Sequence, residues 1–258
     1  MHLCWVEMME EKEQYLVSIV VLAYNEEHNL STQVEACAEW FRRLEDHPEG
    51  VWPEVFDSFA ETHAVGEVLI VDDGSTDGTS RVAGELSAAY PFVRVIRHHT
   101  NLGMGAAVRS GYGAARGRYV TQLPADCQIL PTTLERLLPE LEKADLVLSV
   151  YKERGDGVKR ALMSRGFQFL VRALYGHEPK YTGTMILRSS LLSDHPIRSR
   201  TFFANLELPF RLIDSQVAFR VVQIEALPRR SGASKVANPM RIIEVVSEMI
   251  HIRLGDWR

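Results

Sequence analysis

Two adjacent aspartates, Asp72 and Asp73, follow an aliphatic run and could bind a ligand at the end of a strand. The next residues, 74–79, read Gly-Ser-Thr-Asp-Gly-Thr, which is typical of a tight turn before a helix. Asp77 can cap that helix, and Gly74 permits a positive φ, so the turn itself needs no ligand. The adjacent carboxylates repel each other unless a cation or hydrogen-bond donors offset the repulsion. We therefore predict a ligand role for Asp72 and Asp73.

A further carboxylate, Asp126, stands two positions before Gln128 in the stretch Pro124-Ala125-Asp126-Cys127-Gln128. This stretch also follows an apolar run, so we expect it at the end of another strand. Carboxylate and amide oxygens suit Mg²⁺ or Mn²⁺, hard cations that often bridge to substrate phosphates. One carboxylate is a small ligand set, so the spacing alone does not establish a metal site.

Two stretches could bind the anionic part of a ligand. Residues 101–111 are rich in Gly and Ala at a predicted helix start, where free backbone amides attract anions. Close packing of the helix explains the same glycines, and the Gly-Lys-Ser/Thr ending of a Walker loop is absent. Residues 229–235 read Arg-Arg-Ser-Gly-Ala-Ser-Lys, which suits phosphate oxygens, although such a run is also typical of a solvated loop.

The sequence Tyr24-Asn25-Glu26-Glu27 places polar groups directly after the first apolar run. At the edge of a sheet these side chains could hold a base or a ribose. An Asn-Glu pair is also a common helix start, so the stretch is not specific alone.

Short β-branched runs alternate with longer helical patterns, which predicts an α/β fold with a mostly parallel sheet and helices on both faces. Such sheets bind ligands at the carboxyl ends of their strands. We expect strands at residues 17–22, 68–71, 93–96, 119–123, 146–150, 184–187 and 217–224. We expect helices near residues 30–44, 82–89, 104–115, 134–141, 159–175 and 241–252.

The chain divides into an N-terminal extension (1–15), one large domain (16–236) and a C-terminal amphipathic helix (237–258). Within the domain, residues 45–64 are acidic and aromatic and contain no Lys or Arg. We interpret them as a solvated insertion rather than an acidic arm that binds a partner. For the C-terminal helix, core packing is favoured over a membrane anchor, because its polar face has few basic residues.

The composition excludes several classes of protein. The 258 residues carry a net charge of −5 with 46% hydrophobic residues, so we expect a globular chain with no nucleic-acid partner. The three cysteines lack metal-ligand spacing and favour a reducing compartment. No run approaches the roughly 20 apolar residues of a membrane span, and the acidic start is unlike a signal peptide. We therefore expect a cytoplasmic protein.

Taken together, these stretches resemble the family-2 glycosyltransferases, in particular the branch of dolichyl-phosphate mannosyltransferase and other polyprenyl-phosphate sugar transferases. The motifs run in the family's order from about residue 16 to 236. The resemblance implies a GT-A fold that binds a nucleotide-diphosphate sugar, with Mg²⁺ or Mn²⁺ as cofactor. The absence of a Gln-x-x-Arg-Trp motif favours single transfers over processive synthesis.

The resemblance also implies roles for individual residues. Those matching Ala23, Tyr24, Glu26 and Asp73 line the nucleoside pocket, and we add Asp72, Gly103 and Ala125 to this nucleotide site. Those matching Asp126 and Gln128 meet the metal and the diphosphate, which makes Asp126 a candidate catalytic residue. Those matching Arg229 and Lys235 hold phosphate, and we add Ser234 and Lys152, although a solvated face explains Lys152 nearly as well.

The chain departs from the family in two places. Pro124 replaces the first Asp of the usual Asp-Ala-Asp metal motif, and Pro cannot ligate a metal. Residues 180–185, Lys-Tyr-Thr-Gly-Thr-Met, lack the Asp that relatives carry before a Ser-Gly-Phe strand. Pro124 keeps open a nucleotide-sugar-binding or regulatory subunit with impaired catalysis, and the second departure concerns recognition of the acceptor.

The expected reaction is inverting hexosyl transfer from a GDP- or UDP-sugar to a polyprenyl phosphate at the cytoplasmic face of a membrane. A phosphate acceptor is already ionised and needs no base, whereas a saccharide hydroxyl would need one. For that alternative Glu207 is the candidate catalytic base, although a surface helix start is the favoured interpretation of this residue. Peripheral membrane contact and a homodimer both remain open.

Overall fold

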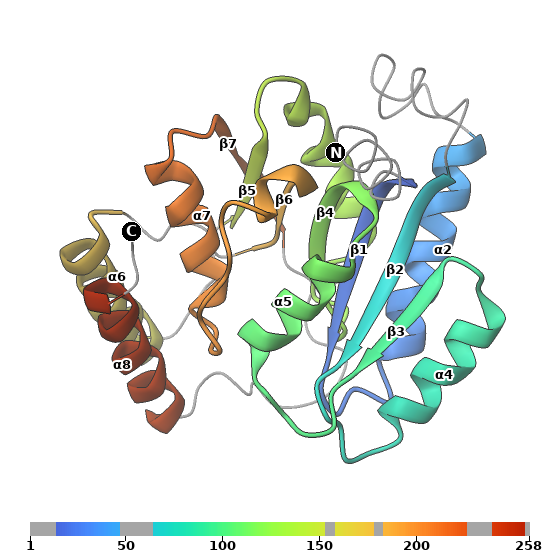
Figure 1. The fold of residues 1–258 in the computed structure, drawn as a ribbon, viewed down its shortest axis with the longest axis horizontal. Helices are drawn as coiled ribbons and strands as arrows, with labels where there is room; N and C mark the ends of the chain where they lie inside the picture. The colour runs from blue at the N-terminus through green and yellow to red at the C-terminus, as the bar shows by residue number, and fades with distance from the viewer. Residues whose placement is uncertain (1–13, 47–63, 153–157, 178–182, 226–238, 256–258) are drawn as a thin grey trace, which may run out of the picture.

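The computed structural model describes residues 14–46, 64–152, 158–177, 183–225 and 239–255. They build one seven-stranded sheet in the order β3-β2-β1-β4-β6-β5-β7 (Figure 1). The strands are β1 (Tyr15–Ala23), β2 (Ala64–Asp72), β3 (Val93–Arg97), β4 (Gly117–Pro124), β5 (Leu146–Tyr151), β6 (Met185–Arg188) and β7 (Phe219–Ile224). Every pairing is parallel except those of β6, which runs antiparallel to β4 and β5.

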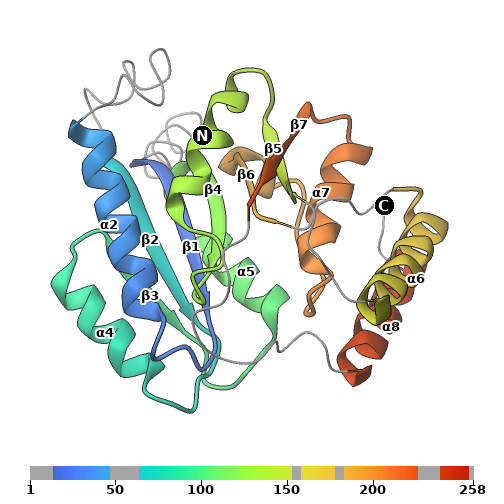
Figure 2. The ribbon, with the colours of Figure 1, turned by 180° about the vertical axis from the view of Figure 1, so that it is seen from behind.

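Helices cover both faces of the sheet, as predicted (Figures 1 and 2). One face is covered by α2 (Leu30–Asp46), α4 (Thr79–Ala89), η2 (Pro131–Arg136) and η3 (Leu138–Glu142). The other face is covered by α5 (Met104–Ala114), η4 (Ser189–Leu192) and α7 (Ala204–Asp214). Two further helices, α6 (Val158–Tyr175) and α8 (Pro239–Gly255), pack together beside α7 and share a small apolar cluster with it.

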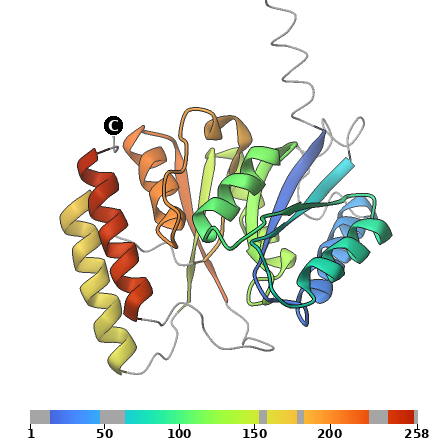
Figure 3. The same cartoon turned by 60° about the horizontal axis from the view of Figure 1, so that its bottom comes forward.

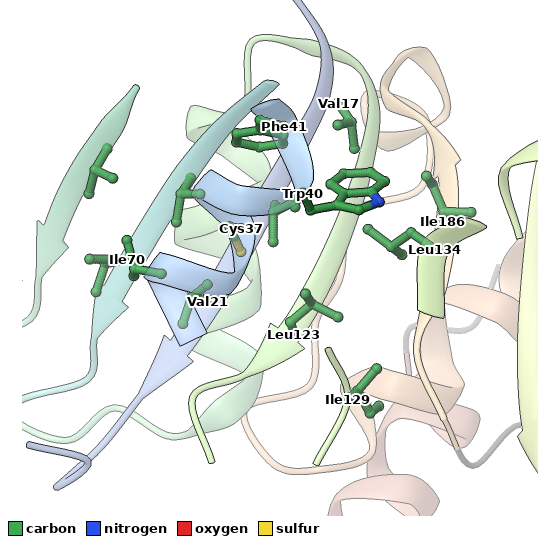
Figure 4. Close-up of a cluster of buried hydrophobic side chains, with 14 of the residues drawn as sticks. Val17, Val21, Cys37, Trp40, Phe41, Ile70, Leu123, Ile129, Leu134 and Ile186 are labelled. Atoms are coloured by element: carbon green, nitrogen blue, oxygen red, sulfur yellow. The ribbon is translucent and has the colours of Figure 1, made fainter. Parts of the chain in front are cut away.

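The core between α2 and the sheet explains why the two form together. Trp40 and Phe41 of α2 lie over the sheet near Val17 of β1, and Cys37, one turn earlier in α2, lies nearer Val21 (Figure 4). A β-carbon on Gly66 would lie 2.3 Å from the Phe41 ring, so only glycine lets the helix approach β2 this closely. Burial of each aromatic ring contributes on the order of 2–3 kcal/mol to the stability of this packing.

All seven predicted strands are present, although β2 begins four residues earlier than predicted. The prediction of one α-helix over residues 134–141 is wrong, because this stretch forms the two 3₁₀ helices η2 and η3. Pro131 and Pro139 lie in their first turns, and Pro139 lacks the amide hydrogen that a continuous helix would need there. The apolar stripe itself is confirmed, since its leucines are buried.

Some sequence-based predictions lie outside the described residues. These are residues 47–63 of the acidic insertion, residues 1–13 of the N-terminal extension and the cationic stretch 229–235 with Arg229, Ser234 and Lys235. The division of the chain into extension, domain and terminal helix stays a prediction. Within the described part of the chain, no helix is both long and apolar enough to span a bilayer.

Candidate functional site

The parallel register brings the ends of β1, β2 and β4 to one edge of the sheet. Ala23 pairs with Asp72, and Leu22 pairs with Pro124. The ladder continues one step beyond the strands, since the Asp73 amide donates to the Ala23 carbonyl at 2.9 Å and the Ala125 amide donates to the Leu22 carbonyl at 3.2 Å. The predicted nucleotide residues after these three strands therefore lie side by side.

The turns that follow β1 and β2 are cross-linked. Asn25 has a positive φ of 53°. Its side-chain oxygen accepts the Thr76 backbone amide at 2.9 Å, and its backbone amide donates to the Ser75 hydroxyl at 3.0 Å. The Glu27 carboxylate accepts the Gly78 amide at 2.8 Å, at the start of α4. The polar side chains after β1 thus organise the turn after β2. The Gly78 backbone amide, which has no partner within α4, is capped by Glu27, 51 positions away in the chain.

Two carboxylates in these turns act within the protein. Asp77 accepts the Thr79 amide at 3.0 Å and the Thr79 hydroxyl at 2.5 Å, which confirms its predicted role at the start of α4. Desolvation opposes ionisation of Asp77, but these hydrogen bonds outweigh it and lower the pKa of its carboxyl. Glu26, predicted in the nucleotide pocket, accepts from the Asn29 side-chain amide at 2.8 Å beside the half-buried Tyr24.

Asp72 is fully buried and satisfied by its own turn. Its carboxylate accepts the Ser75 amide at 2.9 Å and the Ser80 hydroxyl, and the Arg97 guanidinium lies 3.8 Å away. The expectation that the aspartate pair requires an external cation or ligand is therefore wrong for Asp72. Protein donors offset its charge, as buried carboxylates require.

Asp73 is the centre of a second set of contacts, with 5% of its surface exposed. One carboxylate oxygen accepts the Leu102 amide at 2.9 Å and lies 2.7 Å from Nδ1 of His98, and the other accepts the Gly103 amide at 2.9 Å. The opposite ring nitrogen of His98 lies 2.9 Å from the Ser110 hydroxyl on α5. Asp73 thereby ties the start of α5 to the end of β2, which brings Gly103 to the same edge.

The glycine-rich turn before α5 uses its amides internally. Besides the two amides that Asp73 accepts, the Gly105 amide donates to the Arg200 carbonyl at 3.0 Å. A β-carbon on Gly105 would lie 2.1 Å from the Ser199 carbonyl oxygen, and one on Gly103 would lie 2.5 Å from that of Arg200. Of the two interpretations, close packing is therefore confirmed, and the expectation of free amides for a diphosphate is wrong for these donors.

The stretch after β4 holds the predicted metal residues at the same edge. Asp126 is 6% exposed, and its carboxylate accepts the Gln128 amide at 3.2 Å. Cys127 takes a positive φ of 59°, and the Gln33 side chain of α2 donates to the Ile129 carbonyl at 3.0 Å. Among the described residues, no three His, Cys, Asp or Glu side chains gather as a metal site. Asp126 and Gln128 therefore supply one carboxylate and one amide.

Two neutral side chains, Gln122 of β4 and Asn205 of α7, contact each other on the α5 and α7 side of the sheet. The Gln122 side chain of β4 donates to the side-chain oxygen of Asn205 at 2.6 Å. The side-chain NH2 group of Asn205 lies 3.4 Å from the Met104 sulfur. Gln122 is 7% exposed, and its own carbonyl oxygen has no hydrogen-bond partner among the described residues. No local pattern in the sequence predicts this contact, because Asn205 is 83 positions from Gln122 and 101 positions from Met104.

Glu207 is not at the surface, which corrects the favoured interpretation. It lies in the first turn of α7 with no exposed surface. Its carboxylate accepts the amides of Arg198 and Ser199, the latter at 2.7 Å, and the Arg211 guanidinium at 3.0 Å. Both oxygens are committed to donors of the protein, so the structure does not present Glu207 as an available base.

The described part of the basic site is small. Lys152 is exposed just after β5, and its amide donates to the Ile224 carbonyl at 2.9 Å. The structure thus brings together Ala23, Tyr24, Glu26, Asp72, Asp73, Gly103, Ala125, Asp126 and Gln128 at the ends of the first strands. Sequence reasoning missed His98, Asn205 and Glu248, none of which lies in a recognisable motif.

Comparison with known proteins identifies the family of the chain. Residues 18–203 match the family described as Glycosyl transferase family 2. The undecaprenyl-phosphate 4-deoxy-4-formamido-L-arabinose transferase of Pseudomonas fluorescens is 29% identical over 92% of this chain and 64% of its own length. The dolichol-phosphate mannosyltransferase of Pyrococcus furiosus is 30% identical over 58% of this chain and 38% of its own. The chain thus spans less than two thirds of either relative.

A solved structure supports the fold. The glucosyl-3-phosphoglycerate synthase of Mycobacterium tuberculosis, in complex with Mg²⁺ and UDP, superposes with a TM-score of 0.64 at 22% identity, over 97% of this chain and 83% of that one. A second structure of that synthase, with Mn²⁺, UDP and phosphoglyceric acid, gives a TM-score of 0.62. The fold is therefore of the GT-A type, and the chain belongs to glycosyl transferase family 2.

Proposed function

We propose that the chain transfers a hexose from a GDP- or UDP-sugar to a polyprenyl phosphate, with inversion at the sugar carbon. The observation that carries this proposal is the convergence of Tyr24, Asp73 and Asp126 at one edge of the sheet. Doubly wound sheets bind nucleotides at this edge. Two relatives whose names specify polyprenyl-phosphate acceptors support the acceptor class.

The donor set after β4 fits Mg²⁺ or Mn²⁺ only in part. Asp126 and Gln128 would hold the ion through hard oxygen ligands, and diphosphate oxygens would complete its shell. When bound, such an ion stabilises the charge that develops on a leaving diphosphate. The protein's own contribution is to hold Asp126 in a buried position, where its carboxylate accepts the Gln128 amide. Lys152 and the cationic residues Arg229 and Lys235 are proposed to hold phosphate.

The candidate base Glu207 has no carboxylate oxygen free of protein donors. Both oxygens of Glu207 accept donors of the protein, and Gln122 and Asn205 are neutral amides. A phosphate acceptor is ionised near neutral pH and can attack without losing a proton to a base. This arrangement favours polyprenyl phosphate over a saccharide or small-molecule hydroxyl, for which Glu207 was the candidate base.

A second function has support from one substitution. Pro124 stands where the family's metal motif has its first Asp, so the ion would have one protein carboxylate instead of two. A chain with a weakened metal site could bind a nucleotide sugar without transferring it. We therefore retain a nucleotide-sugar-binding subunit as the alternative.

Peripheral membrane contact is proposed for the helical pair α6 and α8. Met249 and Ile252 of α8 are buried, as core packing predicts, whereas Ile243 and Leu254 of α8 and Phe169 of α6 are exposed. An exposed apolar face of this kind suits a membrane on which a lipid acceptor lies. It would equally suit a second copy of the chain, which keeps a homodimer as the other occupant.

The test is product analysis. The protein is incubated with UDP- and GDP-hexoses, Mn²⁺ or Mg²⁺, and either a short polyprenyl phosphate or simple glycans. We expect a lipid-linked sugar from one nucleotide donor and no product from the glycans. A glycan product would contradict the acceptor assignment, and metal-dependent nucleotide binding with neither transfer nor hydrolysis would favour the binding subunit.

A further inference from the structure

The backbone segment of residues 198–201 lies between α5 and α8, before α7 begins (Figures 1 and 3). We refer to it as the 198–201 turn. Its backbone amides point at carboxylates from two helices. Glu207 of α7 accepts the amides of Arg198 and Ser199, and Glu248 of α8 accepts those of Arg200 at 2.7 Å and Thr201 at 3.2 Å.

Glu248 also binds both hydroxyl side chains of the turn. The Ser199 hydroxyl donates to its carboxylate at 2.5 Å, and the Thr201 hydroxyl donates to it at 2.6 Å. Four donors therefore converge on one carboxylate, and hydrogen bonds to a charged group are roughly twice as strong as neutral ones. The turn depends on α8 for this contact, although α8 lies beyond the 18–203 region that matches the family.

The carbonyl side of the turn faces the start of α5. The Arg109 guanidinium donates to the Ser199 carbonyl at 2.6 Å, and the Gly105 amide donates to the Arg200 carbonyl at 3.0 Å. β-Carbons on Gly103 and Gly105 would collide with these carbonyls, so the 198–201 turn packs closely against the backbone at the start of α5. The Arg200 backbone is thus fixed from both sides, by Glu248 at its amide and by α5 at its carbonyl.

The start of α5 in turn reaches the proposed nucleotide site. Asp73 accepts the amides of Leu102 and Gly103 at 2.9 Å each. A continuous series of contacts therefore runs from α8 through the 198–201 turn and the glycine turn to the end of β2. We infer that Glu248 is a positioning residue, which holds the 198–201 turn against α5 and so places Gly103 and Asp73 for the nucleotide. This inference rests on the proposed function.

The alternative is that Glu248 only stabilises the fold. A purely structural residue would lower the unfolding midpoint, and activity would fall only with the fraction of folded protein. A positioning residue would raise the Kd and KM of the donor in folded protein, while kcat at saturating donor stays nearly unchanged. Misplacement of groups remote from the chemistry can cost up to about 100-fold, so a tenfold effect is well within reach.

The experiment measures Kd of UDP and GDP with Mn²⁺, and KM and kcat of the donor, in Glu248→Ala and Glu248→Gln. Glu244→Gln is the matched control, because Glu244 is an exposed carboxylate on the same helix. All proteins are assayed well below their unfolding midpoints. We expect roughly a tenfold rise in Kd and KM for Glu248→Ala, a smaller rise for Glu248→Gln, which keeps one acceptor oxygen, and no change for Glu244→Gln.

Hydrogen exchange at the amides of Gly103 and Gly105 supplies a second readout. We expect faster exchange in Glu248→Ala than in wild type and no change in the control. An unchanged Kd in folded Glu248→Ala overturns the inference and leaves the proposed function intact. Failure of the wild type to bind either nucleotide overturns the proposed function and the inference with it.

Discussion

The two ends of β2 each carry a buried carboxylate, and their partners differ in kind. Near the amino end, Glu67 accepts the Ser18 hydroxyl at 2.6 Å, the Arg116 amide at 2.7 Å and the Arg94 guanidinium at 2.8 Å. These donors tie together β1, β3 and the entry to β4. Just past the carboxyl end, Asp73 accepts from the turn before α5 and from the His98 ring.

Both carboxylates solve the same physical problem, because a buried charge must be matched by donors. Glu67 holds strands to one another, whereas Asp73 shapes a turn at the edge where Asp126 and Tyr24 also lie. A satisfied buried carboxylate is therefore not by itself a sign of a ligand site. The two carboxylates differ in the residues around them. Substitution of Glu67 should change stability alone, whereas substitution of Asp73 should also change nucleotide binding.

The largest effect is expected for Asp73→Ala. It leaves the amides of Leu102 and Gly103 and the His98 ring without their acceptor, which should lower the free energy of unfolding by roughly 3–5 kcal/mol. Donor KM should also rise in protein that remains folded, because the start of α5 is released. Urea unfolding and donor titration check the two parts, with Asp73→Asn as the variant that keeps the shape.

Glu67→Gln should separate the two ends of the strand. We expect a loss of about 2–3 kcal/mol in the free energy of unfolding, because the Arg94 guanidinium loses its charged partner. Donor KM should stay within about twofold of wild type, since Glu67 lies at the opposite edge from Asp126. A large rise in donor KM with an unchanged free energy of unfolding would contradict the proposed difference between Glu67 and Asp73.

Glu207→Gln tests the acceptor side. The substitution keeps one acceptor oxygen and replaces the other with an NH2 group, which cannot accept the hydrogen bonds that both oxygens of Glu207 accept, so we expect a loss of about 1–3 kcal/mol of stability. The pH profile of kcat with polyprenyl phosphate should keep its shape, because no base is required. A rate loss of roughly 100-fold or more in folded protein would restore Glu207 as a base.

The smallest effect concerns acid stability. Partial burial raises the pKa of the Glu248 carboxyl, but the hydrogen bonds from the 198–201 turn outweigh this and lower the pKa below its ordinary value. A carboxyl with a depressed folded-state pKa stabilises the protein above its unfolded pKa of about 4.3, and this contribution is lost as pH falls through the folded value.

Glu248→Gln should therefore weaken the dependence of stability on pH below about pH 4.5, with Glu244→Gln as the control. The measurement is the unfolding midpoint between pH 3 and pH 7. Parallel pH curves for wild type and Glu248→Gln would show that the 198–201 turn does not lower the pKa of the Glu248 carboxyl in the folded state.

Local sequence patterns predict much of the fold. Apolar β-branched runs identified all seven strands, and the spacing of apolar residues identified α2, because both depend on neighbours in the sequence. One exception, η2 and η3, arises where Pro139 interrupts an otherwise helical pattern, and α7 was not among the predicted helices. The antiparallel direction of β6 has no local signal, since it depends on which strands lie beside it.

The candidate site divides in the same way. Motifs placed Asp73 and Asp126 at strand ends, and parallel pairing brought these ends together. The sequence could not show that Asp72 finds its donors in its own turn, that Glu207 is buried, or that Glu248 reaches the 198–201 turn. The Asp72 donors Ser75 and Ser80 are near in the chain, but residue types alone do not show that a turn will aim them at this carboxylate. The contact between Glu248 and Ser199, in contrast, spans 49 positions.

The central claim is that the residues at the carboxyl edge of β1, β2 and β4 bind a metal-bound nucleotide. It is tested most directly by titrating UDP and GDP into wild type and Asp126→Ala by calorimetry, with Mn²⁺ and with chelator. We predict that wild type binds one of the two nucleotides in a Mn²⁺-dependent manner, and that Asp126→Ala loses this dependence while remaining folded. Unchanged Mn²⁺-dependent binding in Asp126→Ala would contradict the claim.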